Sequence, residues 1–274
     1  MEKVCVITGG GSGMGLAAAK FMPKGKIIVV SGRTEKKLLN AVAELEALGY
    51  KAYAKSCDTS DRAKVQELVR FAASLGEVTT VINSAGLSPA MSDPETIIRV
   101  NALGTVYINQ EFSKVMQRGV IVDIASNSAY ILPSFMIMKK TYQLADVDEG
   151  KFVSKLLKMT KMVKEGYQRS GFAYAMSKNF VVWYAKKSAF EYGPKGIRVV
   201  SLSPGLIATD MGNLEKEAGG SLIGYAAEKR MGTAEELGFA IATVADERNG
   251  YLAGVDVLVD GGSTTGMKEF KKKR

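Results

Sequence analysis

Short apolar runs alternate with helical patterns along the whole chain. Seven runs rich in Val and Ile have the length of buried strands, and they lie at residues 4–8, 27–31, 52–57, 78–83, 120–125, 199–203 and 255–259. Apolar residues at helical spacing fill the intervals, at residues 16–22, 35–48, 62–75, 97–116, 175–192 and 234–244. Apolar strands that alternate with helices are typical of a parallel sheet covered on both faces. The pattern therefore predicts an α/β fold, a doubly wound, Rossmann-like parallel sheet of about seven strands, in a single domain over residues 1–267.

This rhythm breaks at residues 130–170, an insert between the fifth strand and the next helix. Apolar residues recur there at helical spacing, which predicts a helix through Phe152, Leu156, Met159 and Val163. Lysines 151, 155, 158 and 164 lie mostly on another side of that helix, and methionines 136, 138, 159, 162 and 176 cluster in the same stretch. Two interpretations stay open. The helix packs on its own domain or a partner subunit, or it forms a wall for a bulky apolar substrate, to whose shape methionine adapts.

Glycine-rich and polar motifs follow three of the predicted strands. The first strand runs into TGGGSGMG at residues 8–15, which then opens a helix. Glycines there let the backbone approach a dinucleotide pyrophosphate, and the helix N-terminus adds positive potential. The motif NSAG at residues 83–86 ends the fourth strand, at the edge where ligands bind in open α/β sheets. Asp58 follows the third strand, where it accepts from an adenine amine or caps the next helix.

Tyr174 and Lys178 stand four residues apart in YAMSK. This spacing is one helical turn, so both side chains point into the same space. A free tyrosine titrates near pH 10, so it needs help to exchange a proton at neutral pH, and a nearby ammonium group stabilises the phenolate. A tyrosine acid beside a lysine, facing a nicotinamide, is suited to reducing a carbonyl group or oxidising an alcohol.

Together these motifs resemble the short-chain dehydrogenase/reductase family, in its compact single-domain branch, over nearly the whole chain. Six motifs occur in the family's order, namely TGGGSGMG, NSAG, RVNALG, DIASNS, YAMSK and SLSPGLIAT, and VDVLVDGGS resembles the family's closing strand and turn. The departures are Ser84 in place of a second asparagine, Ser201 in place of a frequent asparagine, and the long insert. Some hydroxysteroid dehydrogenases of this family also carry an insert between the catalytic serine and tyrosine.

The resemblance implies four catalytic residues, Asn101, Ser126, Tyr174 and Lys178. Ser126 would hydrogen-bond the substrate oxygen and hold it against the phenol, and Asn101 would help to hold a water chain that feeds protons to Lys178. Ser128 is the alternative for the serine role, but Ser126 stands two residues after Ile124, where the family's serine normally lies.

The end of the second strand bears on the choice of cofactor. An NAD enzyme usually places an acid there, and the position is Gly32 in this chain, followed by Arg33 and Thr34. A guanidinium group suits forked binding of a phosphate, so NADP is favoured over NAD. The expected cofactor contacts are Thr8, Gly9, Ser12, Gly13, Met14, Gly15, Arg33, Thr34, Asp58, Thr59, Asn83, Ala85, Gly86, Tyr174, Lys178, Pro204, Gly205, Ile207 and Thr209.

Composition excludes several other classes of protein. The 274 residues include no histidine, so mechanisms that need histidine as base or metal ligand are ruled out. The two cysteines and the absence of a long apolar stretch predict a cytoplasmic protein with no membrane partner. The net charge is +9, of which residues 268–274 carry +4. Without interleaved aromatic residues this tail predicts a disordered end rather than a nucleic-acid site.

We therefore expect a cytoplasmic, homo-oligomeric (dimeric or tetrameric) NADP-dependent oxidoreductase that interconverts a secondary alcohol and a ketone. A bulky apolar substrate, a steroid or bile acid, is expected first, and small 3-oxo or other carbonyl compounds are the alternative. A substrate with an acidic end would find the insert lysines nearby. Two other classes compete, an epimerase or dehydratase, which usually needs a larger C-terminal domain, and a non-catalytic NADP sensor, which need not keep Ser126, Tyr174 and Lys178.

Overall fold

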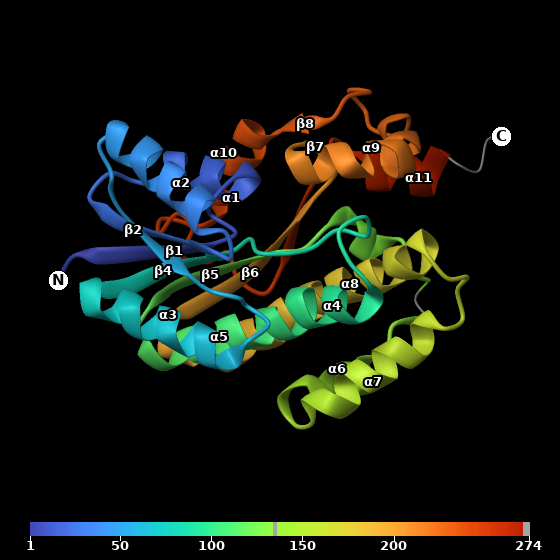
Figure 1. Cartoon of the computed structure of the whole chain (residues 1–274), viewed down its shortest axis with the longest axis horizontal. Coiled ribbons are helices and arrows are strands. Elements are labelled where there is room, and N and C mark those ends of the chain that lie inside the picture. Colours follow the sequence, from blue (N-terminus) through green and yellow to red (C-terminus); the bar gives the residue numbers. More distant parts are fainter. Residues whose placement is uncertain (134–135, 271–274) are drawn as a thin grey trace.

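A computed structural model of the chain describes residues 1–133 and 136–270, without the side chains of residues 216–219 and 221. Its main sheet is parallel throughout, with the order β3-β2-β1-β4-β5-β6-β9 (Figure 1). The strands are β1 (Lys3–Thr8), β2 (Lys26–Gly32), β3 (Lys51–Ser56), β4 (Glu77–Asn83), β5 (Gly119–Ile124), β6 (Ile197–Pro204) and β9 (Asp256–Val259). All seven coincide with the predicted runs to within two residues. Two more short strands, β7 (Ile207–Ala208) and β8 (Gly232–Thr233), pair with each other.

Helices cover both faces of this sheet (Figure 1). One face carries α1 (Gly13–Phe21), α2 (Glu35–Ala47) and α10 (Ala234–Val244), and the other carries α3 (Arg62–Leu75), α5 (Gly104–Val115) and α8 (Tyr167–Tyr192). The strands bury apolar side chains toward both layers, which explains why their sequences are apolar rather than alternating. The predicted doubly wound α/β fold is confirmed.

The long helix predicted over residues 97–116 is divided in the structure. It consists of α4 (Pro94–Ile98), a π-helical turn (Arg99–Leu103) and α5. Asp93 caps α4, since its carboxylate accepts from the amides of Glu95 and Thr96 at 2.9 and 3.1 Å. The π turn contains Asn101, and single π turns inside helices often mark functional sites.

The insert forms α6 (Lys139–Tyr142) and α7 (Glu149–Thr160) beneath α8 (Figure 1). Phe152 and Leu156 are fully buried, and the Phe152 ring lies 4.8 Å from that of Phe180 in α8. A polar network holds the outer edge, where Arg62 of α3 donates to Glu111 of α5 at 2.8 Å and to Glu149 at 2.9 Å. The helix predicted in the insert is therefore present, and its apolar face packs on its own domain.

Two segments near the C-terminal end of the chain go beyond the sequence expectation. The sequence pattern predicts no helix between residues 203 and 234, whereas α9 (Asp210–Ile223) is a helix that contains Gly219 and Gly220. Thr209 caps it by accepting from the amide of Gly212 at 3.1 Å. At the C-terminus, α11 (Ser263–Phe270) extends past the expected domain end at residue 267, and Lys268 lies 5.3 Å from the ring of Tyr130. The rest of the expected disordered tail, residues 271–274, lies outside the described residues.

Candidate active site

The strand order reverses between β1 and β4, and a cavity of about 550 Å³ lies beyond the carboxyl ends of these strands. Such a reversal leaves a crevice, because the connections leave the sheet in opposite directions. The glycine loop forms one wall of the crevice and the segment after β4 forms another. A Cβ at Gly9, where φ is +66°, would lie 2.7 Å from the carbonyl oxygen of Ser84, so these segments approach each other only with glycine in place.

The N-terminus of α1 is suited to an anion. Ser12 precedes the helix without a side-chain cap, and the first turn contains no acidic residue. The first backbone amides of the helix therefore lack a side-chain partner, and they carry the positive end of the helix dipole. Gly13 has φ of +56°, and a Cβ added there would meet only Thr209 across the cavity. This geometry fits a dinucleotide pyrophosphate.

The far end of the same cavity is basic. Gly32, Arg33 and Thr34 line it as predicted, and Lys37 of α2 joins them. The sequence does not mark Lys37 as a cofactor contact, and only the three-dimensional position of α2 reveals its place in the wall. Asp58 also lines the cavity, but its carboxylate already accepts from the amide and hydroxyl of Ser60, at 2.9 and 2.7 Å.

Thr8 and Asn83 lie behind the cavity wall instead of on its surface. The Thr8 hydroxyl donates to Asn83 Oδ1 at 2.9 Å and accepts from the Ala85 amide at 3.1 Å. Asn83 Nδ2 in turn donates to Thr105 Oγ1 and Asp123 Oδ1, both at 3.1 Å. Both side chains are buried. Their contacts hold the ends of β1, β4 and β5 together, so they shape the cofactor cavity from behind it.

A second cavity, of about 500 Å³, adjoins the first and contains the predicted chemistry. Tyr174, Lys178 and Ser126 all line it. Helix α8 presents Tyr174 and Lys178 one turn apart, with the Lys178 Nζ 5.9 Å from the centre of the tyrosine ring. Ser126 follows β5 and caps a 3-10 turn (Asn127–Tyr130) by accepting from the Ser128 amide at 3.2 Å. Ser128, the alternative serine, lines the same cavity.

Burial shifts the proton affinities of both groups on α8. It raises the pKa of Tyr174, and a hydrogen bond with Ser126 acts in the opposite direction. Burial lowers the pKa of Lys178 to about 8, against the attraction of Asp123. The ammonium group is anchored by donating to the carbonyl oxygen of Ile124 at 2.8 Å. Positive charge next to the ring favours the phenolate form, so a nicotinamide cation bound there would assist Tyr174.

Asn101 lies next to this pair and lines neither cavity. Its amide accepts from the Leu87 amide at 2.8 Å and donates to the Leu87 carbonyl at 3.0 Å. A Cβ at Gly86 would approach Asn101 Oδ1 to 3.2 Å and Lys178 Nζ to 3.4 Å. Asn101 and Lys178 thus both lie close to Gly86, and the π turn gives Asn101 its position.

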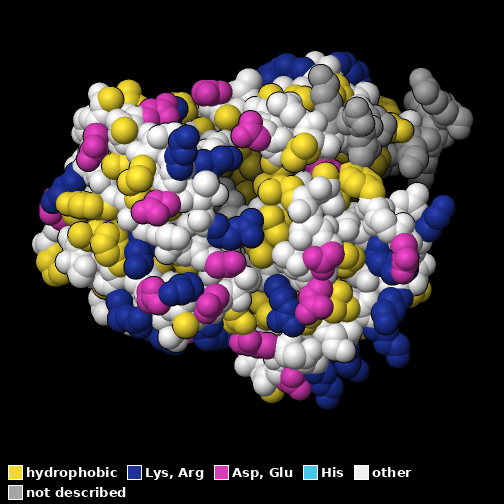
Figure 2. All heavy atoms as spheres, viewed as in Figure 1, with side chains coloured by type: hydrophobic (Ala, Val, Ile, Leu, Met, Phe, Trp, Pro, Cys, Tyr) yellow, Lys and Arg dark blue, Asp and Glu magenta, His cyan; other side chains and the backbone are white. Residues whose placement is uncertain are grey.

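Apolar side chains dominate the rest of the second cavity. They come from the start of the insert, from α8 and the segment just before it, and from β7, α9 and the segment before β7. They include Ile131, Leu132, Val163, Phe172, Leu206, Met211 and Leu222. Pro204, Gly205 and Ile207, which were expected as cofactor contacts, line this cavity, whereas Thr209 lines both. Figure 2 shows that this face of the molecule is hollowed near its centre, with hydrophobic side chains around the hollow.

The insert contributes to this cavity through its two ends and not through α7. Phe152, Leu156 and Met159 pack against the core around α8, and only Val163 of the four predicted wall residues lines the cavity. The four lysines are exposed, and none of them lines it. Met136, Met138, Met159, Met162 and Met176 are also absent from the lining, where Met14 and Met211 are found. The interpretation of α7 as a substrate wall is therefore wrong, because its apolar face is already used in packing.

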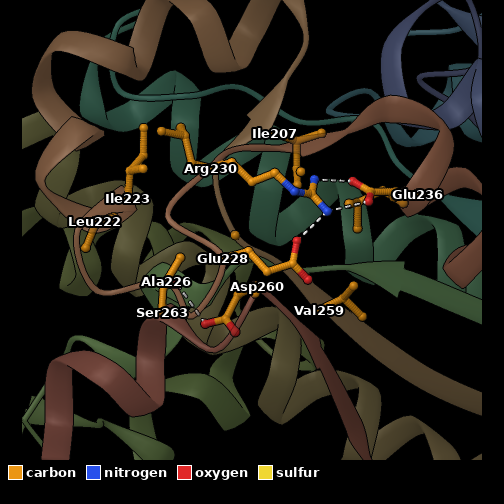
Figure 3. Close-up of a pocket in the computed structure, with 15 residues that line it drawn as sticks. Ile207, Leu222, Ile223, Ala226, Glu228, Arg230, Glu236, Val259, Asp260 and Ser263 are labelled. Atoms are coloured by element: carbon orange, nitrogen blue, oxygen red, sulfur yellow. Dashed lines mark hydrogen bonds and ion pairs between the residues drawn. The ribbon is translucent and has the colours of Figure 1, made fainter. Parts of the chain in front are cut away.

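A smaller cavity of about 200 Å³ adjoins the second one and shares Gly205, Leu206, Ile207 and Leu222 with it (Figure 3). Its rim carries Arg230, which donates to Glu236 at 2.7 and 2.8 Å and pairs with Glu228 at 2.5 Å. None of the candidate catalytic side chains lines it. This ion cluster joins the segment after α9 to the start of α10. The cavity is therefore part of the packing that holds α9 in position.

Sequence comparisons agree with this architecture. The family profile described as short chain dehydrogenase matches residues 3–138, and the profile described as Enoyl-(Acyl carrier protein) reductase matches residues 134–264. The chain is 28% identical over 268 residues to the short-chain dehydrogenase/reductase bsc3 of Alternaria brassicicola, with 96% of each chain covered. It is 27% identical over 279 residues to 3beta-hydroxysteroid dehydrogenase 2 of Eggerthella lenta, covering 95% of this chain and 94% of that protein. It is also 27% identical over 272 residues to meso-2,3-butanediol dehydrogenase of Serratia marcescens, covering 96% and 95%.

Solved structures share the fold at lower identity. A dehydrogenase/reductase from Sinorhizobium meliloti superposes with a TM-score of 0.77 at 22% identity, over 95% of this chain and 94% of that one. A short chain dehydrogenase from Burkholderia cenocepacia in complex with NADP gives 0.76 at 23% identity, over 96% and 97%. With six motifs in order, a seven-stranded doubly wound sheet and matching profiles from residue 3 to residue 264, the chain belongs to the short-chain dehydrogenase/reductase family of NAD(P)-dependent oxidoreductases that act on CH–OH groups.

Proposed function

We propose that this protein is an NADP(H)-dependent enzyme that interconverts a bulky, apolar secondary alcohol and its ketone, with hydroxysteroids as the leading substrates. The observation that carries the proposal is the apolar cavity of about 500 Å³ that opens onto Tyr174 and adjoins the nucleotide crevice. Binding pockets for ligands of this size commonly have volumes of about 300–1,000 Å³ and a mainly apolar lining.

In the reducing direction Tyr174 acts as the general acid. A bound nicotinamide would supply the hydride to the carbonyl carbon. The Tyr174 hydroxyl gives its proton to the carbonyl oxygen, which Ser126 holds by a hydrogen bond. Lys178 stabilises the resulting phenolate by its charge. Asn101 holds the Leu87 backbone beside the site and would help to hold the water chain that feeds protons to Lys178. The oxidising direction uses the same groups in reverse.

Preference for NADP rests on the basic end of the nucleotide crevice. Arg33 and Lys37 line it together with Thr34, and no acidic side chain stands at Gly32, where it would repel the extra phosphate. A guanidinium binds phosphate with two parallel hydrogen bonds, while an ammonium adds a point charge. The solved relative from Burkholderia cenocepacia in complex with NADP supports the same choice.

Smaller substrates are the second candidate. The chain's relatives include a meso-2,3-butanediol dehydrogenase as well as the 3beta-hydroxysteroid dehydrogenase, at the same 27% identity. Resemblance at this level does not separate the two substrate classes. The size and lining of the cavity favour the larger class, because apolar burial contributes about 25 cal/mol per Å². A non-catalytic NADP sensor is disfavoured by the joint presence of Ser126, Tyr174 and Lys178 around one cavity.

The test is a steady-state comparison of NADPH oxidation with ketosteroids and with short-chain ketones, repeated with NADH. We expect higher kcat/KM for ketosteroids and for NADPH. The matched control is Tyr174→Phe, which shows how much of the signal depends on the proposed acid. If short-chain ketones are reduced with a kcat/KM equal to or greater than that of the ketosteroids, the steroid assignment is contradicted. The smaller substrates are then the supported class.

We also propose a homo-oligomer in the cytoplasm. Large apolar side chains remain exposed at one corner of the described structure, with Phe190 at 84% and Tyr251 fully exposed, near the free edge of β9. Exposed aromatic residues beside an open strand edge are typical of protein interfaces. Both cysteines are buried and unpaired, as expected in a reducing compartment. No helix within the described residues has the length and apolar character to cross a membrane.

A further inference from the structure

One carboxylate stands in the mainly apolar wall of the substrate cavity. It belongs to Glu215, in the first half of α9. Of the residues that line this cavity, Lys178 and Glu215 carry the charged side chains. Lys178 is bound to the Ile124 carbonyl at the catalytic end, so Glu215 determines the charge of the remaining wall.

Two donors hold the Glu215 carboxylate in this position. The Ala90 amide, in the loop after β4, donates to Oε1 at 3.0 Å. The Tyr167 hydroxyl, from the first residue of α8, donates to Oε2. Each carboxylate oxygen can accept a further hydrogen bond. The group therefore joins three segments around the cavity and keeps acceptor capacity for a ligand.

No cation compensates this carboxylate within the part of the chain that the structure describes. The ion pairs of the insert and of α8 involve other acids, and Arg169 pairs with Glu165 at 2.9 Å. The insert lysines, expected to favour a substrate with an acidic end, lie outside the lining. The Glu215 charge also contributes to the raised pKa of Tyr174, so its field reaches the reacting centre. An anionic group on the substrate would be repelled across a cavity of low polarity.

We propose that Glu215 selects the substrate class of this cavity, admitting bulky apolar ketones and alcohols whose far end bears a hydroxyl or an ammonium and rejecting those that end in a carboxylate or sulfate. This inference rests on the proposed function, since it concerns the ligand of the same cavity. It replaces the sequence-based expectation of an acidic substrate end. A hydroxyl or ammonium would donate to the free lone pairs of Glu215, whereas a carboxylate would face a like charge.

The experiment uses three ketosteroids with one ring skeleton and one reacting ketone, which differ only in a hydroxyl, amine or carboxylate at the far end. Values of kcat/KM are measured with NADPH for the wild type and for Glu215→Gln, which keeps the side-chain volume and removes the charge. We expect the wild type to prefer the hydroxyl and amine forms over the carboxylate by about tenfold or more, which corresponds to a single unfavourable charge contact. In Glu215→Gln the carboxylate form should gain and the amine form should lose.

Two further variants separate selection from a purely structural role. Tyr167→Phe removes one donor to the carboxylate and keeps the charge, so a loosened α9 would change kcat/KM for all three ketones alike. Glu165→Gln removes an exposed carboxylate that pairs with Arg169 and lies outside the lining, and it should leave the preference unchanged. Equal use of the three ketones by the wild type, or a uniform change in Glu215→Gln, would overturn the inference.

Failure of the proposed function gives a different result. If no ketosteroid is reduced while a short-chain ketone is, the steroid assignment falls. Linear ketones that carry the same three end groups at the steroid's length then decide the role of Glu215. A preference for the carboxylate form in that series would contradict the proposed selection by Glu215.

Discussion

Tyr174 is partly buried in a cavity wall, and desolvation raises its pKa in the free protein. Replacement by phenylalanine removes the transferable proton and keeps the ring, which packs against the core. We expect Tyr174→Phe to lower kcat by about 10²–10⁴-fold, the usual contribution of a general acid or base. Binding of NADPH, measured by fluorescence titration, should change little because the glycine loop provides those contacts. A variant that retains most of its activity would exclude Tyr174 as the acid.

Replacement of Arg33 tests whether this single side chain determines the preference for NADPH over NADH. Its guanidinium lines the nucleotide crevice, while the neighbouring Lys36 is exposed outside the lining. Loss of a charge-assisted hydrogen bond costs about 1.5–3 kcal/mol, so Arg33→Ala should weaken NADPH binding by roughly ten- to a hundredfold and NADH binding much less. Lys36→Ala is the matched control and should leave both dissociation constants unchanged. Equal affinities of the wild type for the two cofactors would show that Arg33 does not discriminate between them.

At the scale of elements, the insert has two parts with different effects. Phe152 of α7 is fully buried against Phe180, so Phe152→Ala should lower the free energy of unfolding by about 3–5 kcal/mol, with the smaller change Phe152→Leu as a milder form. Neither variant should alter the ratio of kcat/KM between a ketosteroid and a short ketone, provided that the protein remains folded. Leu132→Ala, in the cavity wall, should change that ratio with a smaller loss of stability. Chemical denaturation and steady-state kinetics measure the two quantities.

A contact between β1, β2 and the segment after α10 makes the stability of the fold depend on pH. Glu247, after α10, accepts from Lys3 of β1 and forms an ion pair with the buried Lys26 of β2, at 2.7 and 2.9 Å. Hydrogen bonds from the two lysines lower the pKa of Glu247 to about 2. A depressed carboxyl pKa stabilises the fold above the unfolded value near 4.3, and this contribution disappears as the pH falls toward 2.

Glu247→Gln should therefore be less stable than the wild type at pH 7, by about 1 kcal/mol or less because solvent screens a half-exposed pair. The difference should shrink between about pH 4 and pH 2. Urea denaturation at a series of pH values measures it, with Glu35→Gln as a control at an exposed carboxylate outside the ion pairs of the described structure. A difference that stays constant with pH would show that the pair is not responsible.

The sequence predicted the regular elements well because their signals are local. Apolar runs and the glycine loop mark strands and turns without reference to distant residues, and YAMSK sets Tyr174 and Lys178 on one helical face. Two features escaped prediction for a physical reason. Whether Phe152 faces a substrate or Phe180 depends on where α7 docks, and helical spacing alone gives only its apolar face. The sequence does not mark Lys37 or Glu215 as cavity residues, because only the tertiary placement of α2 and α9 brings them into the cavity walls.

At the scale of the whole molecule, the two cavities form one continuous site around the end of the sheet. They share Met14, Ser84, Gly86, Leu87, Thr209 and Met211, which lie between the glycine loop, the β4 edge and α9. The proposed catalytic side chains come from the segment after β5, from the π turn and from α8, which covers the face of the sheet opposite α1 and α2. A bound nucleotide would thus be held mainly by one half of the fold and the proposed acid by the other, so the proposed chemistry depends on the register of β1, β4 and β5.

Substitutions on the exposed surface around the free edge of β9 test the proposed homo-oligomer. Phe190, in the last turn of α8, lies beside Gly254, and Tyr251 and Val255 are exposed close by in the sequence, at full and 41% exposure. If this corner is an interface, the double variant Phe190→Glu, Tyr251→Glu places like charges where two copies would meet, so the oligomer should dissociate or weaken. Sedimentation velocity over a range of concentrations measures this, with circular dichroism to show that the fold persists. The exposed pair Leu39→Glu, Leu48→Glu on α2 and its C-terminal cap is the control. An unchanged sedimentation coefficient for the β9 variant would move the interface elsewhere.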